Sequence, residues 1–310
     1  MSSDATALQG QRPGLGVRDS LSVPLAFLSR LTRNRLALIG LVIIGGFTIA
    51  ALFAPWIAPR DPEHQISSEA MQSPSWNHLF GTDNVGRDTL SRIIYGARVS
   101  LFVGLTSMAL AAAIGVPLGL LGGYYGGLVD SLAMRAMDTL LAFPALLLAI
   151  FIVAVLGPSV SNAIFAIGII YIPAFARLTR ANVLSLREKE FVEAAKCLGA
   201  GDGRIMLRSI LPNCSSSLIV QFTLGVGYAM LIEAGLSFLG LGVQPPTPAW
   251  GQMVGLARNF ITIAPWLITF PGLAIFLAVL AFNFLGDGLR EATDPRLRGR
   301  RLVAGKKGKM

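Results

Sequence analysis

Charged residues are scarce in this 310-residue chain and are absent from long stretches of it. They make up 14% of the residues, whereas a soluble domain carries about 25%. No Asp, Glu, Lys or Arg falls between Arg98 and Asp130, between Asp138 and Arg177, or between Arg258 and Asp287. A soluble helix needs a polar face, while a helix that crosses roughly 30 Å of hydrocarbon needs about 20 apolar residues. The sequence therefore excludes an ordinary soluble protein and predicts an integral membrane protein.

Motifs for catalysis and nucleotide binding are also missing. There is no G-x-x-x-x-G-K-[ST] loop to cradle ATP phosphates and no G-x-S-x-G, H-E-x-x-H or C-x-x-C motif. The two histidines, His64 and His78, are interpreted as solvated loop residues, because two scattered histidines are a weak sign of a nickel site. The two cysteines, Cys197 and Cys214, fall in or beside a predicted cytoplasmic loop and are expected to be reduced. We predict that the chain is not an enzyme and binds no metal or other cofactor itself.

Long apolar runs are what the sequence has in abundance, and 53% of its residues are hydrophobic. We predict an all-α membrane protein with six spanning helices, the third and fourth forming a hairpin that turns at Gly157-Pro158-Ser159. Two polar or non-helical stretches, 56–97 and 240–258, connect spans on one side of the membrane. The predicted spans are 36–54, 99–122, 131–156, 160–176, 215–238 and 265–285.

The net charge of +9 comes largely from Lys and Arg that flank the apolar runs. A nucleic-acid-binding protein would instead spread them along a soluble face, so that class is excluded. Six spans place three basic segments on the same side of the membrane. They are the N-terminal segment, the loop between spans four and five, and the C-terminal tail. That side is the cytoplasm by the positive-inside rule, which places both termini there. The N-terminal group consists of Arg12, Arg18, Arg30, Arg33 and Arg35.

The chain is divided into four parts on this basis. Residues 1–34 are expected to be a cytoplasmic tail, in which Val23 to Arg33 either lie on the membrane surface as a helix or extend the first span. Residues 35–98 hold the first span and an outer loop, 99–290 a core of five spans, and 291–310 a basic cytoplasmic tail. The first apolar run is too long for a signal-peptide core and lacks a clean cleavage site, so we expect a retained anchor.

The loop at 187–213 is the most informative segment of the sequence. Residues 188–198 favour a helix, which Gly199 would end. A second short helix is expected to begin at Asp202 as N-cap, and Pro212 is expected to mark the turn back into the membrane. Such an exposed helix suits a groove on a soluble partner. Its apolar residues at helical spacing are Phe191, Ala194, Ala195 and Leu198.

This loop resembles the EAA loop of permease subunits in bacterial ABC importers. The resemblance is carried by Glu193-Ala194-Ala195, by Gly199 and by Leu211-Pro212, without an insertion between them. It implies the type I ABC importer permease fold and a coupling helix that docks into an ATP-binding subunit, which would hold ATP and Mg²⁺. The alternative is an ordinary connecting loop, which the span count, side and position in the chain disfavour. The residues implied in coupling are Glu190, Glu193, Ala194, Ala195, Gly199, Leu211 and Pro212.

Two further segments resemble the C-type permeases for dipeptides, oligopeptides, nickel and glutathione. They are Phe80–Asp88 and Glu233–Gly242, and the similarity extends over about 36–295. The first is a turn rich in Gly and Asn on the predicted outer face, where a substrate-delivering protein must dock. Its motif residues are Gly81, Thr82, Asp83, Gly86, Arg87 and Asp88.

The resemblance implies a bacterial inner-membrane complex for peptide import. Its other members would be a second homologous permease, two ATP-binding subunits and an extracytoplasmic substrate-binding protein. Nickel and glutathione remain alternatives to peptides, because the binding protein largely chooses the ligand. A stand-alone secondary carrier or channel would transport without partners and should carry more charges within its spans. A membrane-embedded enzyme should show nucleophile or His and Asp clusters that are missing here.

Two acidic residues lie within or near apolar segments. Glu233 either lines the passage or makes a structural hydrogen bond against the Gly-rich turn that follows it, and the structural role is preferred. Asp138 either contacts substrate or forms a local ion pair with Arg135, and the local role is again preferred. Prolines that could kink helices around a translocation path are Pro144, Pro173 and Pro271.

Overall fold

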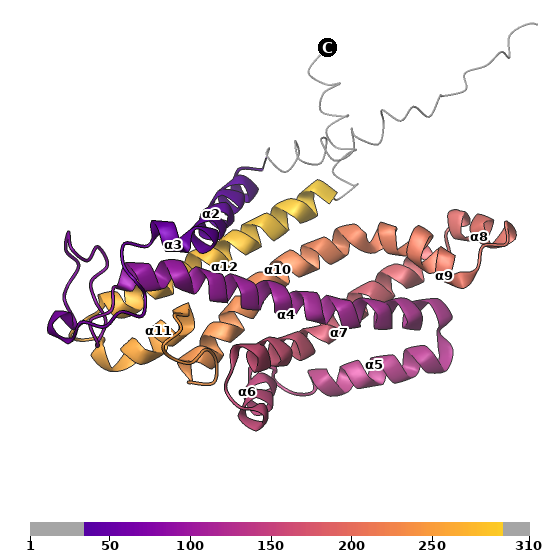
Figure 1. Ribbon diagram of the computed structural model, residues 1–310. Coiled ribbons are helices and arrows are strands. Elements are labelled where there is room, and N and C mark those ends of the chain that lie inside the picture. Colours follow the sequence, from indigo (N-terminus) through magenta and orange to yellow (C-terminus); the bar gives the residue numbers. More distant parts are fainter. Residues whose placement is uncertain (1–33, 294–310) are drawn as a thin grey trace, which may run out of the picture.

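The computed structural model describes residues 34–293, which form a bundle of long helices with short elements at both ends (Figure 1). Within these described residues, five helices are long and apolar enough to cross a membrane, and a bent pair brings the total to as many as six. This agrees with the prediction of about six spans. Four of them are α2 (Arg35–Leu52), α4 (Thr89–Tyr125), α7 (Val160–Leu186) and α12 (Trp266–Thr293), and the fifth is the continuous helical segment Asp202–Phe238, most of which is α10 (Leu211–Phe238).

The first and last of these helices lie together where the described chain begins and ends. The amide of Asn34, the N-cap residue of α2, donates a hydrogen bond from Nδ2 to Glu291 Oε2 of α12 at 2.7 Å. The chain therefore enters and leaves the bundle at the same end, as an even number of crossings requires. Outside the described residues lie the predicted surface helix at 23–33, the tail from 294 onward, and Arg12, Arg18, Arg30 and Arg33.

The predicted third span is not one straight helix. It is broken into α5 (Gly127–Leu141) and α6 (Ala145–Leu156), which are bent by 88° relative to each other. Pro144 is the N-cap residue of α6, and a proline both lacks an amide hydrogen and disfavours the helical conformation in the residue before it. The bend is therefore a consequence of Pro144. Pro173 and Pro271 instead lie inside continuous helices.

Several predicted spans are shorter than the observed helices, because the helices continue beyond the apolar runs. The α4 helix begins ten residues before the predicted start at Val99, and α7 continues to Leu186, ten residues beyond the predicted end at Ala176. The predicted turn at Pro212 is wrong, because α9 (Asp202–Arg204) and the π-helical turn η2 (Ile205–Ile210) run directly into α10. Pro212 is tolerated there because it lies in the first turn of α10.

The stretch 240–258 was predicted to be non-helical, yet it contains α11 (Trp250–Ala257). The indole of Trp250 is fully buried and its Nε1 donates to the carbonyl oxygen of Ile93 in α4 at 2.9 Å. Together with the buried side chains of Gln252, Met253 and Ala257, Trp250 anchors the short helix against the bundle. The remaining short elements are α3 (Ala54–Ile57), α8 (Glu190–Cys197) and the 3₁₀ turns Ser67–Glu69 and Arg258–Phe260.

The centre of the bundle is the close packing of α4 against α7. A Cβ atom added at Gly115 would lie 2.6 Å from the carbonyl oxygen of Ile172 and 2.7 Å from Phe175 Cβ. One turn further, a Cβ at Gly119 would overlap the carbonyl oxygen of Ala176 and lie 2.7 Å from Thr179 Cβ. Small residues at four-residue spacing allow two helix backbones to approach closely within a membrane. The glycines of α4 thus fix the position of α7.

Replacement of Gly119 by leucine is expected to separate α4 from α7 and to destabilise the bundle. Overpacking of a tight contact costs about 1–3 kcal/mol or more, so the midpoint of thermal unfolding of the purified protein in detergent should fall by several degrees. Gly46→Leu is the matched control, because a Cβ at Gly46 meets no atom within 4 Å. Equal midpoints for the two variants would contradict this packing.

Candidate functional site

The helix predicted for 188–198 is present as α8, and it ends at Gly199 as expected. Lys189 is the N-cap residue, and Glu190 and Glu193 lie in the first turn, where carboxylates interact favourably with the helix dipole. Gly199 has φ of +78°, a left-handed conformation that glycine adopts without steric cost. Its amide donates to the carbonyl oxygen of Lys196 at 2.9 Å. Local residues therefore stabilise both ends of α8: the carboxylates in its first turn and Gly199 after its last turn.

One face of α8 is anchored to the membrane bundle. Val192 is fully buried, and Ala195 packs against the same cluster. The cluster also contains residues of α4, α7, η2 and α10, namely Leu120, Val183, Ile205, Met206, Ile210 and Cys214. The predicted apolar stripe missed Val192 and wrongly included Ala195 in the face that points away from the bundle. The sequence signal that could have found the inner face is the three-residue spacing of Val192 and Ala195.

The opposite face of α8 is exposed. Glu190, Glu193, Ala194 and Cys197 are all exposed on it. Two large apolar side chains flank this face: Phe191 is 42% exposed and Leu198 is 87% exposed. We call the surface formed by Glu190, Phe191, Glu193, Ala194, Cys197 and Leu198 the α8 face. It combines carboxylates with exposed apolar groups, a composition suited to a groove on another protein.

Polar contacts fix α8 and its flanks to the end of α4. The Tyr124 hydroxyl donates to Asp202 Oδ1 at 2.8 Å, and the Lys196 ammonium lies over the Tyr124 ring at 5.8 Å. Arg187 donates from Nη1 to the carbonyl oxygen of Gly123 at 3.1 Å. The prediction that Asp202 is an N-cap is wrong, because Gly201 takes that position and the Asp202 carboxylate binds Tyr124 instead.

Leu211 and Pro212 lie apart from the α8 face. They belong to the first turn of α10 and line an open, largely apolar groove of about 410 Å³ together with Leu207, Ala112 and Phe175, among others. The structure thus brings Glu190, Glu193 and Ala194 together on one surface. It places Leu211 and Pro212 at the base of the loop, where they shape the path of the chain back into the bundle.

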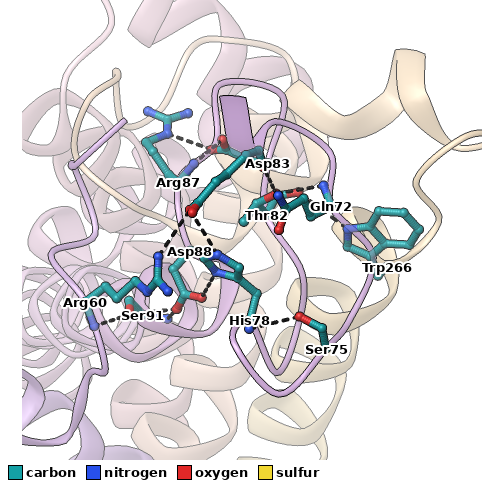
Figure 2. A network of polar contacts seen from close by, with 11 residues as sticks. Arg60, Gln72, Ser75, His78, Thr82, Asp83, Arg87, Asp88, Ser91 and Trp266 are labelled. Atoms are coloured by element: carbon teal, nitrogen blue, oxygen red, sulfur yellow. Dashed lines mark hydrogen bonds and ion pairs between the residues drawn. The ribbon is translucent and has the colours of Figure 1, made fainter. Parts of the chain in front are cut away.

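The outer-loop motif forms a buried polar network (Figure 2). Asp83 Oδ2 accepts a hydrogen bond from Arg87 Nε at 2.6 Å, and Asp83 Oδ1 accepts from the Arg87 amide at 2.9 Å. Thr82 is fully buried, and its hydroxyl donates to the carbonyl oxygen of Glu69. At Gly86, φ is +82°, and an added Cβ would overlap the carbonyl of Ile66. A glycine is therefore required there.

Asp88 joins this network to the start of α4. It is the N-cap residue, and Oδ2 accepts hydrogen bonds from both the amide and the hydroxyl of Ser91 at 2.8 Å. Its Oδ1 lies 3.0 Å from His78 Nδ1, while His78 Nε2 lies 3.1 Å from Glu69 Oε2. The expectation that His78 is solvated is wrong, because it is only 2% exposed. Gly81 completes the turn, its amide donating to the carbonyl oxygen of His78 at 2.9 Å.

These contacts define what the motif does within the chain. Thr82, Arg87 and Asp88 are buried, so they order the outer loop rather than form its outermost surface. That surface is made by neighbours such as Trp76, which is 96% exposed, and Leu79, which is 51% exposed. Among residues 34–293, no group of three or more His, Cys, Asp and Glu is arranged to hold a metal ion.

Glu233 lies in a buried hydrogen-bonded chain. It is 1% exposed, and its Oε1 accepts a hydrogen bond from the Ser237 hydroxyl at 2.7 Å. Ser237 Oγ in turn accepts from the amide of Val243 at 3.2 Å. These contacts tie the end of α10 to the Gly-rich turn, which is the geometry of the structural role considered above.

Asp138 does not pair with Arg135. Its carboxylate forms an ion pair with Arg177 of α7, and a second ion pair joins Asp130 of α5 to Arg180 of α7. The sequence missed these partners because the pairs join helices that are far apart in the chain. The two acid–base pairs fix α5 alongside α7.

Known proteins resemble this chain over most of its length. A family model described as "Binding-protein-dependent transport system inner membrane component" matches residues 115–299, and one described as "N-terminal TM domain of oligopeptide transport permease C" matches residues 26–74. The Dipeptide transport system permease protein DppC of Alkalihalophilus pseudofirmus is 51% identical over 269 residues, covering 87% of this chain and 88% of that protein. The Glutathione transport system permease protein GsiD of Escherichia coli is 49% identical, covering 88% and 90%.

A solved structure of the MetNI methionine ABC transporter in inward-facing conformations shares the fold. Its TM-score is 0.54 at 18% identity, and the match covers 66% of this chain and 97% of that chain. At that identity the likeness concerns the arrangement of helices alone.

Replacement of Asp88 by alanine is expected to loosen the outer loop. The variant loses a helix N-cap worth about 1 kcal/mol and leaves buried His78 without one partner, at a cost of about 1–3 kcal/mol. Thermal unfolding of the purified protein and proteolysis of the loop should both reveal the change. Glu63→Ala removes an exposed carboxylate from the same loop and should change the stability by no more than about 0.5 kcal/mol. Equal protease resistance in the two variants would contradict the assigned role of Asp88.

Proposed function

This chain belongs to the family of binding-protein-dependent transport system inner membrane components, and we propose that it forms the peptide path of an ATP-driven importer together with a second, related permease. It is a permease subunit of an ABC importer and a multi-pass protein of the inner membrane. The proposal adds a substrate class, a set of partners and a route of coupling. The partners are two ATP-binding subunits and an extracytoplasmic binding protein.

The α8 face is the observation that carries the proposed coupling. It is an exposed surface on a helix whose other side is fixed by Val192 and Ala195. An anchored helix with an exposed, mixed face can bind a soluble partner without first becoming ordered, which avoids the entropic cost of folding on binding. We assign this face to the groove of an ATP-binding subunit. Both termini would then lie on the cytoplasmic side.

The anchoring of α8 explains how a movement could pass into the membrane. ATP binding draws two ATP-binding subunits together, and each carries a docked coupling helix with it. In this chain α8 is tied to α4 through Tyr124 and to η2 and α10 through the buried cluster around Val192. A change of equilibrium from 1:99 to 99:1 takes roughly 5.5 kcal/mol of differential binding. A helix fixed by both apolar and polar contacts can transmit such an energy without slipping.

Catalysis is assigned to the partners rather than to this chain. We propose that ATP and Mg²⁺ bind to the ATP-binding subunits, and that this chain contributes the path and the coupling helix. The outer loop, ordered by Asp83, Arg87 and Asp88, would present its exposed residues, including Trp76, to the substrate-binding protein.

Short peptides are the proposed substrates. Relatives from three bacteria are named as dipeptide or di/tripeptide permeases and are 47–51% identical to this chain. Other relatives at 49% identity are named as glutathione permeases. Glutathione is itself a tripeptide derivative, so the two groups share the chemistry of small, zwitterionic, peptide-bonded substrates.

The central test of coupling is a charge reversal on the α8 face. Glu193→Lys should lower ATP-driven uptake by the reconstituted importer by about tenfold or more, which lies within the roughly 5–150-fold effects that coupling between two sites produces. The protein should remain in the membrane. Gly199→Leu should act in the same way, because leucine is strained at φ of +78° and would displace the end of α8.

Glu188→Lys is the matched control for charge, because Glu188 is exposed but precedes α8. Uptake and ATP hydrolysis are measured on the same proteoliposomes, so that uncoupling is separated from loss of assembly. Normal uptake by both Glu193→Lys and Gly199→Leu would rule out α8 as the coupling helix.

A further inference from the structure

The ion pair between Asp138 and Arg177 is exposed although it lies among apolar helices. The two side chains are 59% and 52% exposed, whereas those of Asp130 and Arg180 are 18% and 33% exposed. Arg177 is also the only exposed residue between positions 166 and 180 of α7. A charged group stands alone on an otherwise covered stretch of helix.

The position of Arg177 along α7 places it within the membrane. The 27 residues of α7 rise about 40 Å, which exceeds the roughly 30 Å of the hydrocarbon core. Arg177 lies nine residues before Leu186, the last residue of α7, and is therefore about 13 Å from the end that leads to α8. Even if the whole excess of about 10 Å projects on that side, the Cα atom of Arg177 lies about 3 Å inside the hydrocarbon region.

Arg177 does not reach back to the nearer membrane surface. It and Arg180 are one turn apart on α7, about 4.5 Å along the axis. Their partners Asp138 and Asp130 are eight residues apart on α5, about 12 Å along its axis. Since α5 lies alongside α7 (Figure 1), the two arginines diverge, and Arg177 extends away from the α8 end. This is the opposite of snorkelling, in which a long side chain reaches to the interface.

A lipid-facing position for this pair is energetically unfavourable. A charged residue within the hydrocarbon is costly, by up to about 2.5–3.5 kcal/mol at the centre of a membrane helix, and exposure to lipid leaves the polar atoms outside the ion pair without partners. Ionisable residues within membranes face the interior of the assembly or water and mark substrate pathways. Asp138 lies three residues before Leu141, the last residue of α5, after which the chain turns by 88° into α6.

We propose that Asp138 and Arg177 line a water-filled section of the translocation path and there bind the charged ends of a short zwitterionic peptide. The inference rests on the proposed peptide substrate. The guanidinium of Arg177 matches a peptide carboxylate in a bidentate geometry, and the Asp138 carboxylate accepts hydrogen bonds from an α-ammonium group. Without peptide the two residues pair with each other, so neither state leaves a charge unpaired.

The local structure permits such an opening. An extended dipeptide spans about 7 Å, so the two charged groups must separate by several ångströms to admit it. Arg177 has a long side chain that can swing, while the neighbouring pair of Asp130 and Arg180 keeps α5 in place beside α7. A transport site must bind strongly enough to admit its substrate and weakly enough to release it. The ion pair between Asp138 and Arg177 competes with the peptide for the same two side chains, so it weakens peptide binding enough to allow release.

Cysteine accessibility tests whether the pair faces water. Asp138→Cys and Ala136→Cys are placed separately in the otherwise unmodified chain, within the complete importer in lipid nanodiscs, and the parent chain with Cys197 and Cys214 gives the background labelling. Ala136 is exposed at nearly the same depth of α5 but on the opposite face. A membrane-impermeant cationic methanethiosulfonate should label Asp138→Cys about tenfold faster than Ala136→Cys, because only a thiol in water forms the reactive thiolate readily. Addition of dialanine at high concentration during ATP turnover should slow the labelling at position 138, because Arg177 still binds the peptide carboxylate in this variant.

Equal, slow labelling at both positions would place Asp138 against lipid or a partner subunit and would overturn the proposal. Rapid labelling that dialanine leaves unchanged would also overturn it, because the site would be wet without binding peptide. In either case dialanine uptake by the unmodified importer would leave the proposed function intact. Absence of such uptake would instead refute the peptide substrate itself.

A transport measurement supplies the second readout. Arg177→Gln should lower dialanine uptake about tenfold through loss of charge-assisted hydrogen bonds. ATP hydrolysis stimulated by the loaded binding protein should persist, because α8 and the Asp130–Arg180 pair are intact. Parallel loss of hydrolysis and uptake would show that the pair serves assembly or coupling, and would overturn its role in recognition.

Discussion

The close contact between α4 and α7 is the constraint on which the other features of the molecule depend. Gly115 and Gly119 bring the two backbones together so closely that a Cβ atom would collide with the facing helix. The same two helices carry the candidate functional regions at opposite ends. Asp88 caps the start of α4 and orders the outer loop, while α7 leads directly into α8. One rigid pair of helices therefore joins an outer surface to the proposed docking surface for an ATP-binding subunit.

The acidic residues of the membrane region and their partners differ in exposure. Some are buried and stabilise the bundle, whereas one ion pair is exposed. Glu233 is buried and hydrogen bonded, and Asp130 with Arg180 is mostly covered. Asp138 with Arg177 is exposed. Since polar groups without partners are costly within a membrane, an ion pair or a hydrogen bond for each of these side chains is expected on physical grounds. Exposure of a pair is not expected, and it is the feature that points to a path for a charged substrate.

The sequence was sufficient for the class of protein, the approximate number of spans and the position of α8. These follow from local properties: the length of apolar runs, helix-forming residues and a glycine at the helix end. It was insufficient where distant segments decide the outcome. Pro144, Pro173 and Pro271 are alike in sequence, yet only Pro144 lies at a break, because packing around α7 and α12 keeps those helices continuous. His78 was taken for a solvated residue because its partners Glu69 and Asp88 become neighbours only when the loop folds.

The most direct test of the account is native mass spectrometry of the complex that copurifies with this chain in mild detergent. The account predicts a second permease and two ATP-binding subunits in a single assembly. It also predicts that Ala194→Arg, which places a bulky cation on the α8 face, removes the ATP-binding subunits while the second permease remains bound. Recovery of this chain alone, in a preparation that transports substrate without ATP, would contradict the account.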